Sequence, residues 1–386
     1  MYSFKILSEV DPVKWNGDLM KSDCATFFQT AEYLTSEPNR DYFPIFVYVI
    51  DENGNVVGQL GIRIIKTVVM YSSPLFRQFL KLISNITTRG IWLYGPIIHS
   101  NDKKSRMEIL TNIIKANDEI LEKYDLVHIE GHTPPYDLSA DENYKQEFKK
   151  NGYTIQDNVT FLADLTKSID EIWSNVTKKA RGDVNRAKRR NIVVKELTEY
   201  GQLKDYLMLN QEWAKSKGIV ISDPFREMER LWNNHTAGLE KFFLAYKDEK
   251  LIAGLRVACF NGIAYTHFVI KSYDEPTNLG GTLLTWSAIE WAKKSGIRSY
   301  DFSGGPQDNS QNDEKIEQDE KQKDTLLYYK KKWGGDALPY HVLIKVRKKY
   351  SYKLYIVLFN LVRFYHNFKM KKYKKSTNYD KDNAEN

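Results

Sequence analysis

The sequence predicts an α/β protein built from two similar domains, each with a mixed β-sheet. The chain has 386 residues, which is too long for one ordinary hydrophobic core and comfortable for two. One order of elements (helix, hairpin, strand, helix, strand) occurs twice along the chain, and such alternation is typical of α/β folds. A basic segment with a helical pattern lies between the two repeats and predicts a bridge between domains.

These patterns set the expected domain boundaries. The chain divides into a first domain over 1–165, a helical bridge over 166–191, a second domain over 192–345, and a basic, aromatic tail over 346–386. The end of the tail and the polar, weakly apolar segment 308–323 are expected to be disordered or mobile, because they lack the apolar residues that would order them.

In the first half, strand patterns alternate with helical ones. Residues 44–50 are rich in β-branched and aromatic side chains, and the turn at 51–55 contains Asn and Gly, which accept positive φ. Apolar residues recur near the 3.6-residue period over 104–123, which predicts a helix. The other expected elements are a helix at 27–36 and strands at 56–69, 90–96 and 126–130.

The second half follows the same order. Its strongest single signal is the pair Asn261-Gly262, which predicts a hairpin turn between strands at 251–260 and 263–270. The remaining expected elements are helices at 200–215 and 282–295 and strands at 242–246 and 299–302.

The charge of the chain is unevenly distributed. The formal net charge is +7, but residues 178–190 carry a net +6 and residues 345–375 a net +11, so the rest of the chain carries a net −10. Two basic segments on an acidic body are suited to a polyanion such as phosphate, RNA or an anionic membrane surface. Alternatively, both segments are solvated helix faces, or the aromatic tail packs as a helix on the second domain.

Cysteine usage and the N-terminal residues predict a cytoplasmic protein. Cys24 and Cys259 are far apart in the sequence, which argues against a disulfide framework and a zinc site. Acidic residues come before any apolar run of signal-peptide length, and no window approaches the ~20 apolar residues of a spanning helix. We therefore expect a cytoplasmic location, with peripheral contact to the inner membrane surface through the tail as an option.

A glycine-containing segment precedes the helix expected at 282–295. Asn278 and Gly280 lie in the segment from Thr277 to Thr282, where small residues let a backbone approach a ligand and a helix N-terminus offers free N–H groups to an anion. The segment matches the usual coenzyme A pattern of acetyltransferases at one position of three. A plain strand-to-helix turn is the alternative.

Several motifs follow one another along the chain. They are the basic run from Lys178 to Arg189, Asn278, a helix with a central Trp286, Tyr300-Asp301-Phe302, and Tyr329-Lys330 followed by Trp333-Gly334. Taken in order, they resemble those of the Fem family, the peptidoglycan-bridge aminoacyltransferases, and their GNAT-like acyltransferase relatives. The resemblance covers residues 20–345, and it includes departures at the strand end 128–131 and at Tyr329.

The resemblance implies a fold, a reaction and a donor. The expected fold is two tandem GNAT-like domains with mixed sheets, and the expected reaction is attack of an acceptor amine on an activated acyl group. The implied donor is aminoacyl-tRNA, with no resident cofactor. The implied acceptor is a cell-envelope precursor, with a lipid-linked precursor as one option. Such a reaction needs stabilisation of a tetrahedral oxyanion and needs no covalent enzyme intermediate.

The same resemblance assigns roles to eight residues. Glu130 and Lys330 are the expected catalytic residues: Glu130 would position or deprotonate the amine, and Lys330 would stabilise the oxyanion or the tRNA terminus. The expected donor- or substrate-binding residues are Arg181, Arg186, Arg189, Asn278, Gly280 and Asp301. For each there is a structural alternative, such as an interdomain ion pair for Arg181 or a solvated lysine for Lys330.

Other functions compete with this one. The first is an N-acyltransferase that uses acyl-coenzyme A on an envelope polysaccharide precursor, and the second is a non-catalytic protein that binds RNA or membrane. His128, Glu130 and His132 alternate and would share a strand face, but their spacing is not a recognised zinc pattern, so no metal is expected.

Overall fold

The computed structural model describes residues 2–36, 42–66, 86–137, 142–217, 219, 221, 223–272, 279–306, 326–361 and 364. The segment 308–323, the end of the tail and Asn278, for which expectations were given above, lie outside these residues.

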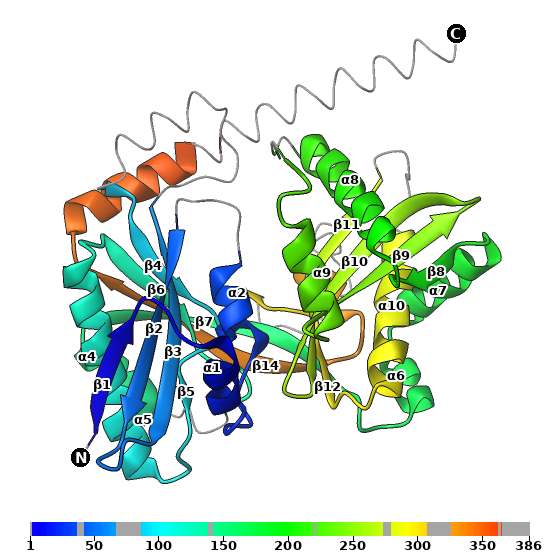
Figure 1. Cartoon of the computed structure of the whole chain (residues 1–386). Coiled ribbons are helices and arrows are strands. Elements are labelled where there is room, and N and C mark those ends of the chain that lie inside the picture. The colour runs from blue at the N-terminus through cyan, green and yellow to red at the C-terminus, as the bar shows by residue number, and fades with distance from the viewer. Residues whose placement is uncertain are drawn as a thin grey trace, which may run out of the picture.

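The first half contains an antiparallel meander followed by a parallel strand pair (Figure 1). β1 (Ser3–Leu7), β2 (Tyr42–Ile50), β3 (Val56–Ile65) and β4 (Arg89–Trp92) pair in that order, and β4 pairs parallel with β6 (His128–His132); β5 (Ile97–Ile98) pairs with β3. One face of this sheet packs on α4 (Lys103–Lys123) and α5 (Glu142–Lys150). The other face packs on α1 (Pro12–Leu19), the 3₁₀-helix η1 (Phe27–Gln29) and α2 (Ala31–Thr35).

The second half repeats this order. β8 (Val193–Glu196), β9 (Glu240–Lys247), β10 (Lys250–Phe260) and β11 (Ile263–Lys271) form the meander, and β11 pairs parallel with β12 (Ser299–Asp301). α6 (Ile169–Asn175), α7 (Lys178–Arg189) and α10 (Leu279–Lys294) cover one face, and α8 (Tyr200–Ser216) and α9 (Met228–Thr236) cover the other. The expected tandem α/β plan with mixed sheets is confirmed.

Local chemistry explains two element boundaries. Asn261 and Gly262 both have positive φ, 48° and 73°, as the hairpin turn between β10 and β11 requires. The helix expected over 27–36 is instead divided at Thr30, whose backbone is extended with ψ 152°. The Thr30 hydroxyl accepts a hydrogen bond from the backbone N–H of Tyr33 at 3.2 Å. This capping bond starts α2 as a new helix, so the single-helix expectation was wrong.

β7 (Tyr153–Asp164) and β14 (Asp336–Val346) belong to both halves. They pair with each other along most of their length, while β14 also pairs with β6 and the end of β7 pairs with β12. Among the described residues the strands form one 14-stranded sheet. Twelve of them follow the order β1-β2-β3-β4-β6-β14-β7-β12-β11-β10-β9-β8, while β5 pairs beside β3 and β13 (Gly305–Pro306) beside β7. The two mixed sheets are therefore joined. β7, from the end of the first half, pairs with β12 of the second sheet, and β14, from the end of the second half, pairs with β6 of the first sheet.

Two glycines bring the chain into β14. Gly334 has φ +75°, and a Cβ there would lie 2.3 Å from the carbonyl oxygen of Asn175. A Cβ on Gly335 would lie 2.9 Å from the backbone of Leu162 in β7. The tight turn after α11 (Leu326–Lys331) therefore requires both glycines, which gives the Trp333-Gly334-Gly335 motif a structural reason.

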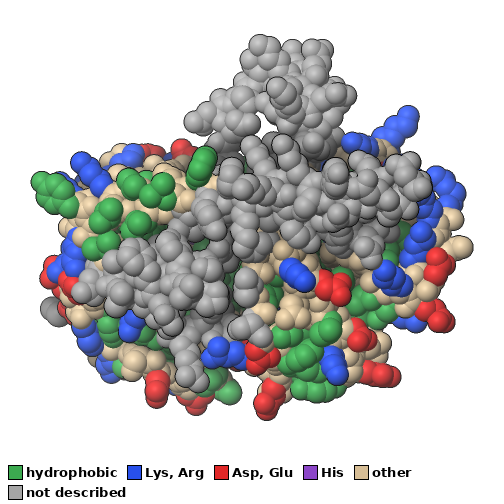
Figure 2. Space-filling model, turned by 90° about the horizontal axis from the view of Figure 1, so that it is seen from above, with side chains coloured by type: hydrophobic (Ala, Val, Ile, Leu, Met, Phe, Trp, Pro, Cys, Tyr) green, Lys and Arg blue, Asp and Glu red, His purple; other side chains and the backbone are tan. Residues whose placement is uncertain are grey.

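A last helix covers the outer end of the first half. Residues 349–361 are helical, and they begin where Arg347 and Lys348 form ion pairs with Asp125 at 2.8 and 2.5 Å. Seen from above, hydrophobic side chains gather over the first half, while charged side chains are spread along the rim of the molecule (Figure 2).

The shared strands predict that the two halves unfold together. A fragment of residues 1–165 would lack β14 and leave the β6 edge unpaired, so we expect the fragment to be unfolded or aggregated. The full chain should unfold in urea in a single transition, with coincident curves from circular dichroism and tryptophan fluorescence. Two separate transitions, or a folded 1–165 fragment, would contradict this expectation.

Candidate active site on the shared sheet

One face of the shared sheet gathers polar and aromatic side chains from both halves. Residues directly opposite in a ladder point to the same face. The β14–β6 register puts Glu130 on the face of Tyr340, and the β14–β7 and β7–β12 registers put Asn158 and Asp301 on that face as well. Residues from β6, β14, β7 and β12 thus meet where the two halves join.

Asp301 is the centre of the polar contacts on this face. Its carboxylate is fully buried and accepts hydrogen bonds from the Thr160 hydroxyl at 2.6 Å, from the backbone N–H of Ser303 at 2.6 Å, and from the Tyr136 hydroxyl. Tyr136 belongs to the first half, so Asp301 fastens the two halves together. Burial raises the pKa of Asp301 above its usual range, although these hydrogen bonds and Lys330 act in the opposite direction.

Lys330 of α11 lies close to this carboxylate. Its ammonium donates a hydrogen bond to the backbone carbonyl of Gly304 at 2.8 Å, and the residue is 9% exposed. Burial lowers the pKa of Lys330, and the nearby Asp301 carboxylate opposes that shift. Lys330 is therefore a partly desolvated cation that is held by the carbonyl of Gly304 and lies near the Asp301 carboxylate.

Glu130 connects to the Lys330 region through two aromatic rings. Glu130 Oε1 lies 3.6 Å from His132 Nε2, and the His132 ring lies 5.6 Å from that of Tyr340. Tyr340 packs on Gly304, where a Cβ would lie 2.5 Å from the Tyr340 ring. The His132 contact is the main cause of the lowered pKa of Glu130, so Glu130 is an anion at neutral pH and a weak base.

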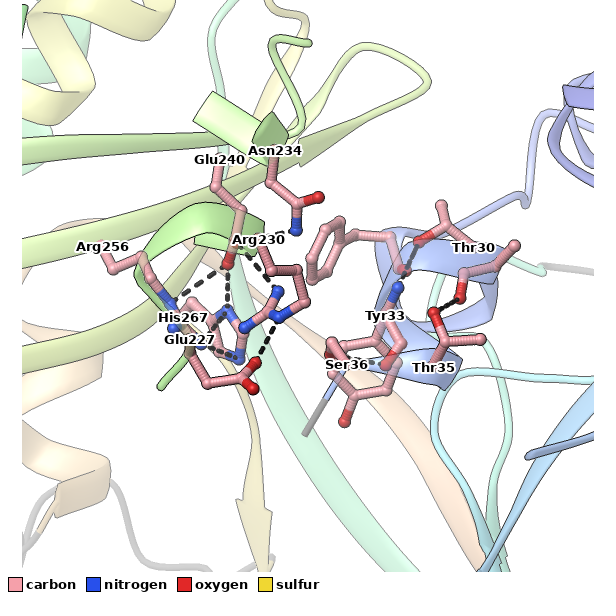
Figure 3. A network of polar contacts seen from close by, with 12 residues as sticks. Thr30, Tyr33, Thr35, Ser36, Glu227, Arg230, Asn234, Glu240, Arg256 and His267 are labelled. Carbon is pink, nitrogen blue, oxygen red and sulfur yellow. Dashed lines mark hydrogen bonds and ion pairs between the residues drawn. The ribbon is translucent and has the colours of Figure 1, made fainter. Parts of the chain in front are cut away.

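A second polar network, around Glu240, lies between the halves (Figure 3). Glu240 is 1% exposed, and its carboxylate lies 3.1 Å from Arg256 Nε, 3.2 Å from His267 Nδ1 and 3.8 Å from Arg230 Nη1. It also accepts a hydrogen bond from Asn234 at 3.0 Å. Burial raises the pKa of Glu240, but the Arg256 charge and the His267 contact outweigh it and bring the pKa to about 2.

The Glu240 network faces aromatic residues of the first half. The His267 ring lies 5.7 Å from Phe27 and 6.3 Å from Tyr33, and Figure 3 shows Thr30, Tyr33, Thr35 and Ser36 opposite the network. Burial, followed by the Arg256 charge, lowers the pKa of His267 to about 4. His267 is therefore neutral at pH 7, and its ring packs β11 against η1 and α2.

The three arginines of the basic bridge have different surroundings in α7. Arg181 donates hydrogen bonds to the backbone carbonyls of Trp173 and Ser174 at 3.2 and 2.7 Å, at the end of α6. Arg186 forms an ion pair with Asp183 and is half exposed, and Arg189 is exposed. Arg186 and Arg189 thus share the solvent-facing side of α7, while Arg181 also joins α6 to α7.

Gly280 lies in the first turn of α10 and is buried there. A Cβ at this position would lie 3.2 Å from the side chains of both Ala253 and Ile252, so glycine allows α10 to pack closely on β10. Within the described ranges, no group of three or more His, Cys, Asp and Glu side chains is arranged to hold a metal ion.

Sequence reasoning missed most of the partners that surround the expected residues. Tyr136, Thr160 and Tyr340 contact Asp301 or Gly304, and Glu240 and His267 form the second network. The chain has 25 tyrosines, so no single tyrosine stands out. Glu240 is the first residue of β9, two positions before the apolar run that starts at Phe242, and that position was the available sequence signal of a buried carboxylate.

We expect Glu240→Gln to destabilise the protein by about 3 kcal/mol at pH 7, because it leaves Arg256 without its buried anion. The pKa of Glu240 falls from 4.5 to about 2 on folding. Its stabilisation is therefore complete above pH 4.5 and is lost as the pH falls toward 2. Below pH 4.5 the variant should lose less stability than the parent, as urea unfolding at each pH would measure.

Glu196→Gln is the matched control, because Glu196 pairs with Lys241 at 3.5 Å on the surface. It should cost at most about 1 kcal/mol. If the Glu240 variant is as stable as this control at pH 7, the network does not stabilise the junction.

Comparison with known proteins follows the same division of the chain. Residues 175–313 match the family model described as an acetyltransferase (GNAT) domain. The whole chain is similar in structure to FemX, with a TM-score of 0.65 and 13% sequence identity, over 91% of this chain and 99% of that chain. No curated protein sequence matches the chain significantly.

Two further solved structures have the same fold. L-PGS from Bacillus licheniformis is similar with a TM-score of 0.54 and 14% identity, over 93% of this chain and 98% of that one. A tandem GNAT protein from the clavulanic acid biosynthesis pathway is similar with a TM-score of 0.53 and 13% identity, over 90% and 98% of the two chains. Residues 175–313 are therefore a GNAT acyltransferase domain, set in the tandem fold that the chain shares with FemX.

Proposed function

We propose that this protein is an N-aminoacyltransferase that moves an aminoacyl group from aminoacyl-tRNA to an amine of a cell-envelope precursor. The observation that carries the proposal is the exposed basic side of α7, which leads directly to the segment that bears Lys330. The structural similarity to FemX supports the same direction.

The basic side of α7 is built by helical periodicity. Ala180, Val184 and Ala187 are buried against the second half, which turns the charged positions outward. The exposed basic residues are Lys178, Lys179, Arg186, Lys188, Arg189 and Arg190. Such a row of cations on one side of a helix is suited to the phosphates of a nucleic acid.

The start of α7 is joined to the residues after Lys330. The backbone N–H of Thr177 donates a hydrogen bond to the carbonyl of Lys332 at 2.9 Å. Burial lowers the pKa of Lys332 to about 8, while Asp183 and Lys179 of α7 act on it in opposite directions. A polyanion bound along α7 would therefore have its end near Lys332 and Lys330.

The reaction requires four changes of bonding. The amine nitrogen forms the C–N bond of the new amide, the ester C–O bond breaks, an N–H bond of the amine breaks, and its proton forms the O–H bond of the ribose hydroxyl that leaves. Negative charge develops on the carbonyl oxygen in the transition state. A preorganised cation in a water-poor site stabilises this charge more than it would in water, and we assign that role to Lys330.

Glu130 is proposed to position the acceptor amine rather than to deprotonate it. Its lowered pKa makes it a weak base, and its carboxylate can accept a hydrogen bond from the neutral amine that attacks. Asp301 is proposed to act on the substrate indirectly, because its oxygens already accept three protein hydrogen bonds. Gly280, in the first turn of α10, and Asn278, which precedes this helix in the sequence, are proposed to hold the polar end of the donor.

The alternative donor is acyl-coenzyme A. It is favoured by the match of residues 175–313 to an acetyltransferase domain and by the N-terminus of α10, since the first N–H groups of a helix suit a pyrophosphate. In that case the exposed side of α7 would have no part in donor binding, so the salt dependence of binding distinguishes the two donors.

The α7 surface predicts a salt-dependent affinity for tRNA. The triple variant Arg186→Gln, Lys188→Gln, Arg189→Gln should weaken tRNA binding. It should also make the slope of log affinity against log salt concentration shallower, by ~0.7 for each single-strand phosphate contact that is lost. Its thermal stability should stay nearly unchanged, because these side chains are exposed. Filter binding over a series of salt concentrations gives the slope.

The matched control removes three exposed charges from the first half, by Lys104→Gln, Lys149→Gln and Lys150→Gln, and it should bind tRNA like the parent. Arg181→Gln should instead lower stability, because Arg181 holds two backbone carbonyls. If the triple variant keeps its tRNA affinity and slope, the coenzyme A alternative is favoured over the proposal.

Lys330→Met should reduce the rate of acyl transfer about 100-fold while leaving tRNA affinity within about twofold, because its cation acts on the transition state. The adjacent exposed Lys331→Met is the control, and it should transfer at the parent rate. Single-turnover kinetics with charged tRNA separate binding from chemistry. Parent-like transfer by the Lys330 variant would make this lysine a structural residue.

A further inference from the structure

The C-terminal helix has two faces of different character. On one face, the rings of Tyr352 and Tyr355 lie 4.8 and 4.9 Å from the ring of His128, and Arg89 lies over Tyr355 at 5.3 Å. Tyr355 is 9% exposed. This face holds the helix on the end of β6 and β4.

The opposite face presents apolar side chains to the outside. We call this set the exposed stripe: Tyr350, Leu354, Val357, Leu361 and Phe364, which are 90%, 46%, 52%, 58% and 71% exposed. Successive members are four, three, four and three residues apart, which places them on one side of a helix. A soluble surface rarely leaves such a continuous apolar row uncovered, so the stripe indicates a binding surface.

The charge around the stripe selects the partner. Lys349 and Lys353 are exposed and adjoin the stripe at helical spacing. In the sequence, residues 345–375 contain eleven Lys and Arg and no acidic residue, and three of these cations, Lys345, Arg347 and Lys348, are paired with acidic residues of the first half. An apolar row beside lysines matches the boundary between the acyl chains and the headgroups of an anionic bilayer. Among the described helices, none is long and apolar enough to cross a membrane, so the match is to the surface.

We propose that the exposed stripe is a docking surface for an anionic membrane. The helix lies along the membrane plane, with the stripe turned toward the acyl chains and the lysines toward acidic headgroups. Its other face stays packed on His128, and the ion pairs of Arg347 and Lys348 with Asp125 keep the start of the helix fixed to the first half. This proposal does not depend on which donor the enzyme uses.

The test is co-sedimentation of the full chain with vesicles of phosphatidylglycerol and phosphatidylcholine in equal parts. The variant Leu354→Gln, Val357→Gln, Leu361→Gln should partition at least about tenfold less, because each buried methylene contributes to membrane binding. The matched control is Val193→Gln with Met208→Gln, two apolar residues of the second half that are 52% and 44% exposed. The control should bind like the parent, and binding of the parent should weaken as salt is raised.

Several outcomes would overturn the proposal. Equal binding of the stripe variant and the parent would show that the stripe does not touch the bilayer. Equal binding of the parent to vesicles of pure phosphatidylcholine would show that binding does not require anionic lipid. If the parent forms a dimer without vesicles and the stripe variant does not, the partner that covers the stripe is a second copy of the chain. A stripe variant with a lowered melting temperature and no vesicle binding by the parent would show that the chain itself covers the stripe. Transfer from charged tRNA to a soluble acceptor should be unchanged in the stripe variant, so this proposal and the proposed function fail independently.

Discussion

The ladder between β7 and β14 is the constraint on which the rest of the structure depends. It joins ten residue pairs whose members are far apart in the sequence, from Asp336 opposite Leu162 to Lys345 opposite Tyr153. Because β7 also pairs with β12 of the second half and β14 with β6 of the first half, neither sheet is complete without a strand from the other part of the chain. The ladder register also decides which side chains share a face, and so it brings Glu130 to the same side as Asp301.

The junction contains two buried carboxylates that are satisfied in different ways. Asp301 accepts hydrogen bonds from neutral donors, Tyr136, Thr160 and a backbone N–H, and burial raises its pKa. Glu240 is surrounded by Arg256, Arg230 and His267, and its pKa falls to about 2. A buried charge needs partners of one kind or the other. In the first arrangement Lys330 lies near the Asp301 carboxylate but donates its hydrogen bond to the carbonyl of Gly304. In the second, Glu240 and Glu227 offset the charges of Arg256 and Arg230.

Parts of the fold with local signals could be predicted from the sequence. The Asn261-Gly262 turn needs two residues that tolerate positive φ, and the helix expected at 104–123 corresponds to α4, Lys103–Lys123. The shared ladder had no local signal, because its partners are brought together only by the folded chain. In the site, the family resemblance indicated Asp301 and Lys330, but their roles there remain predictions. Their partners Tyr136 and Thr160 were missed because single hydroxyl residues carry no pattern in a sequence.

We propose that the donor is an aminoacyl-tRNA, that α7 binds it, and that its acyl group is transferred next to Lys330. The most direct measurement offers the purified full chain labelled aminoacyl-tRNA and labelled acetyl-coenzyme A in parallel, with one peptidoglycan precursor that bears a free amine, and follows label in the precursor. The account predicts transfer from the charged tRNA, with release of uncharged tRNA in equal amount, and no transfer from acetyl-coenzyme A. Transfer of the acetyl group, with the charged tRNA left intact, would contradict it.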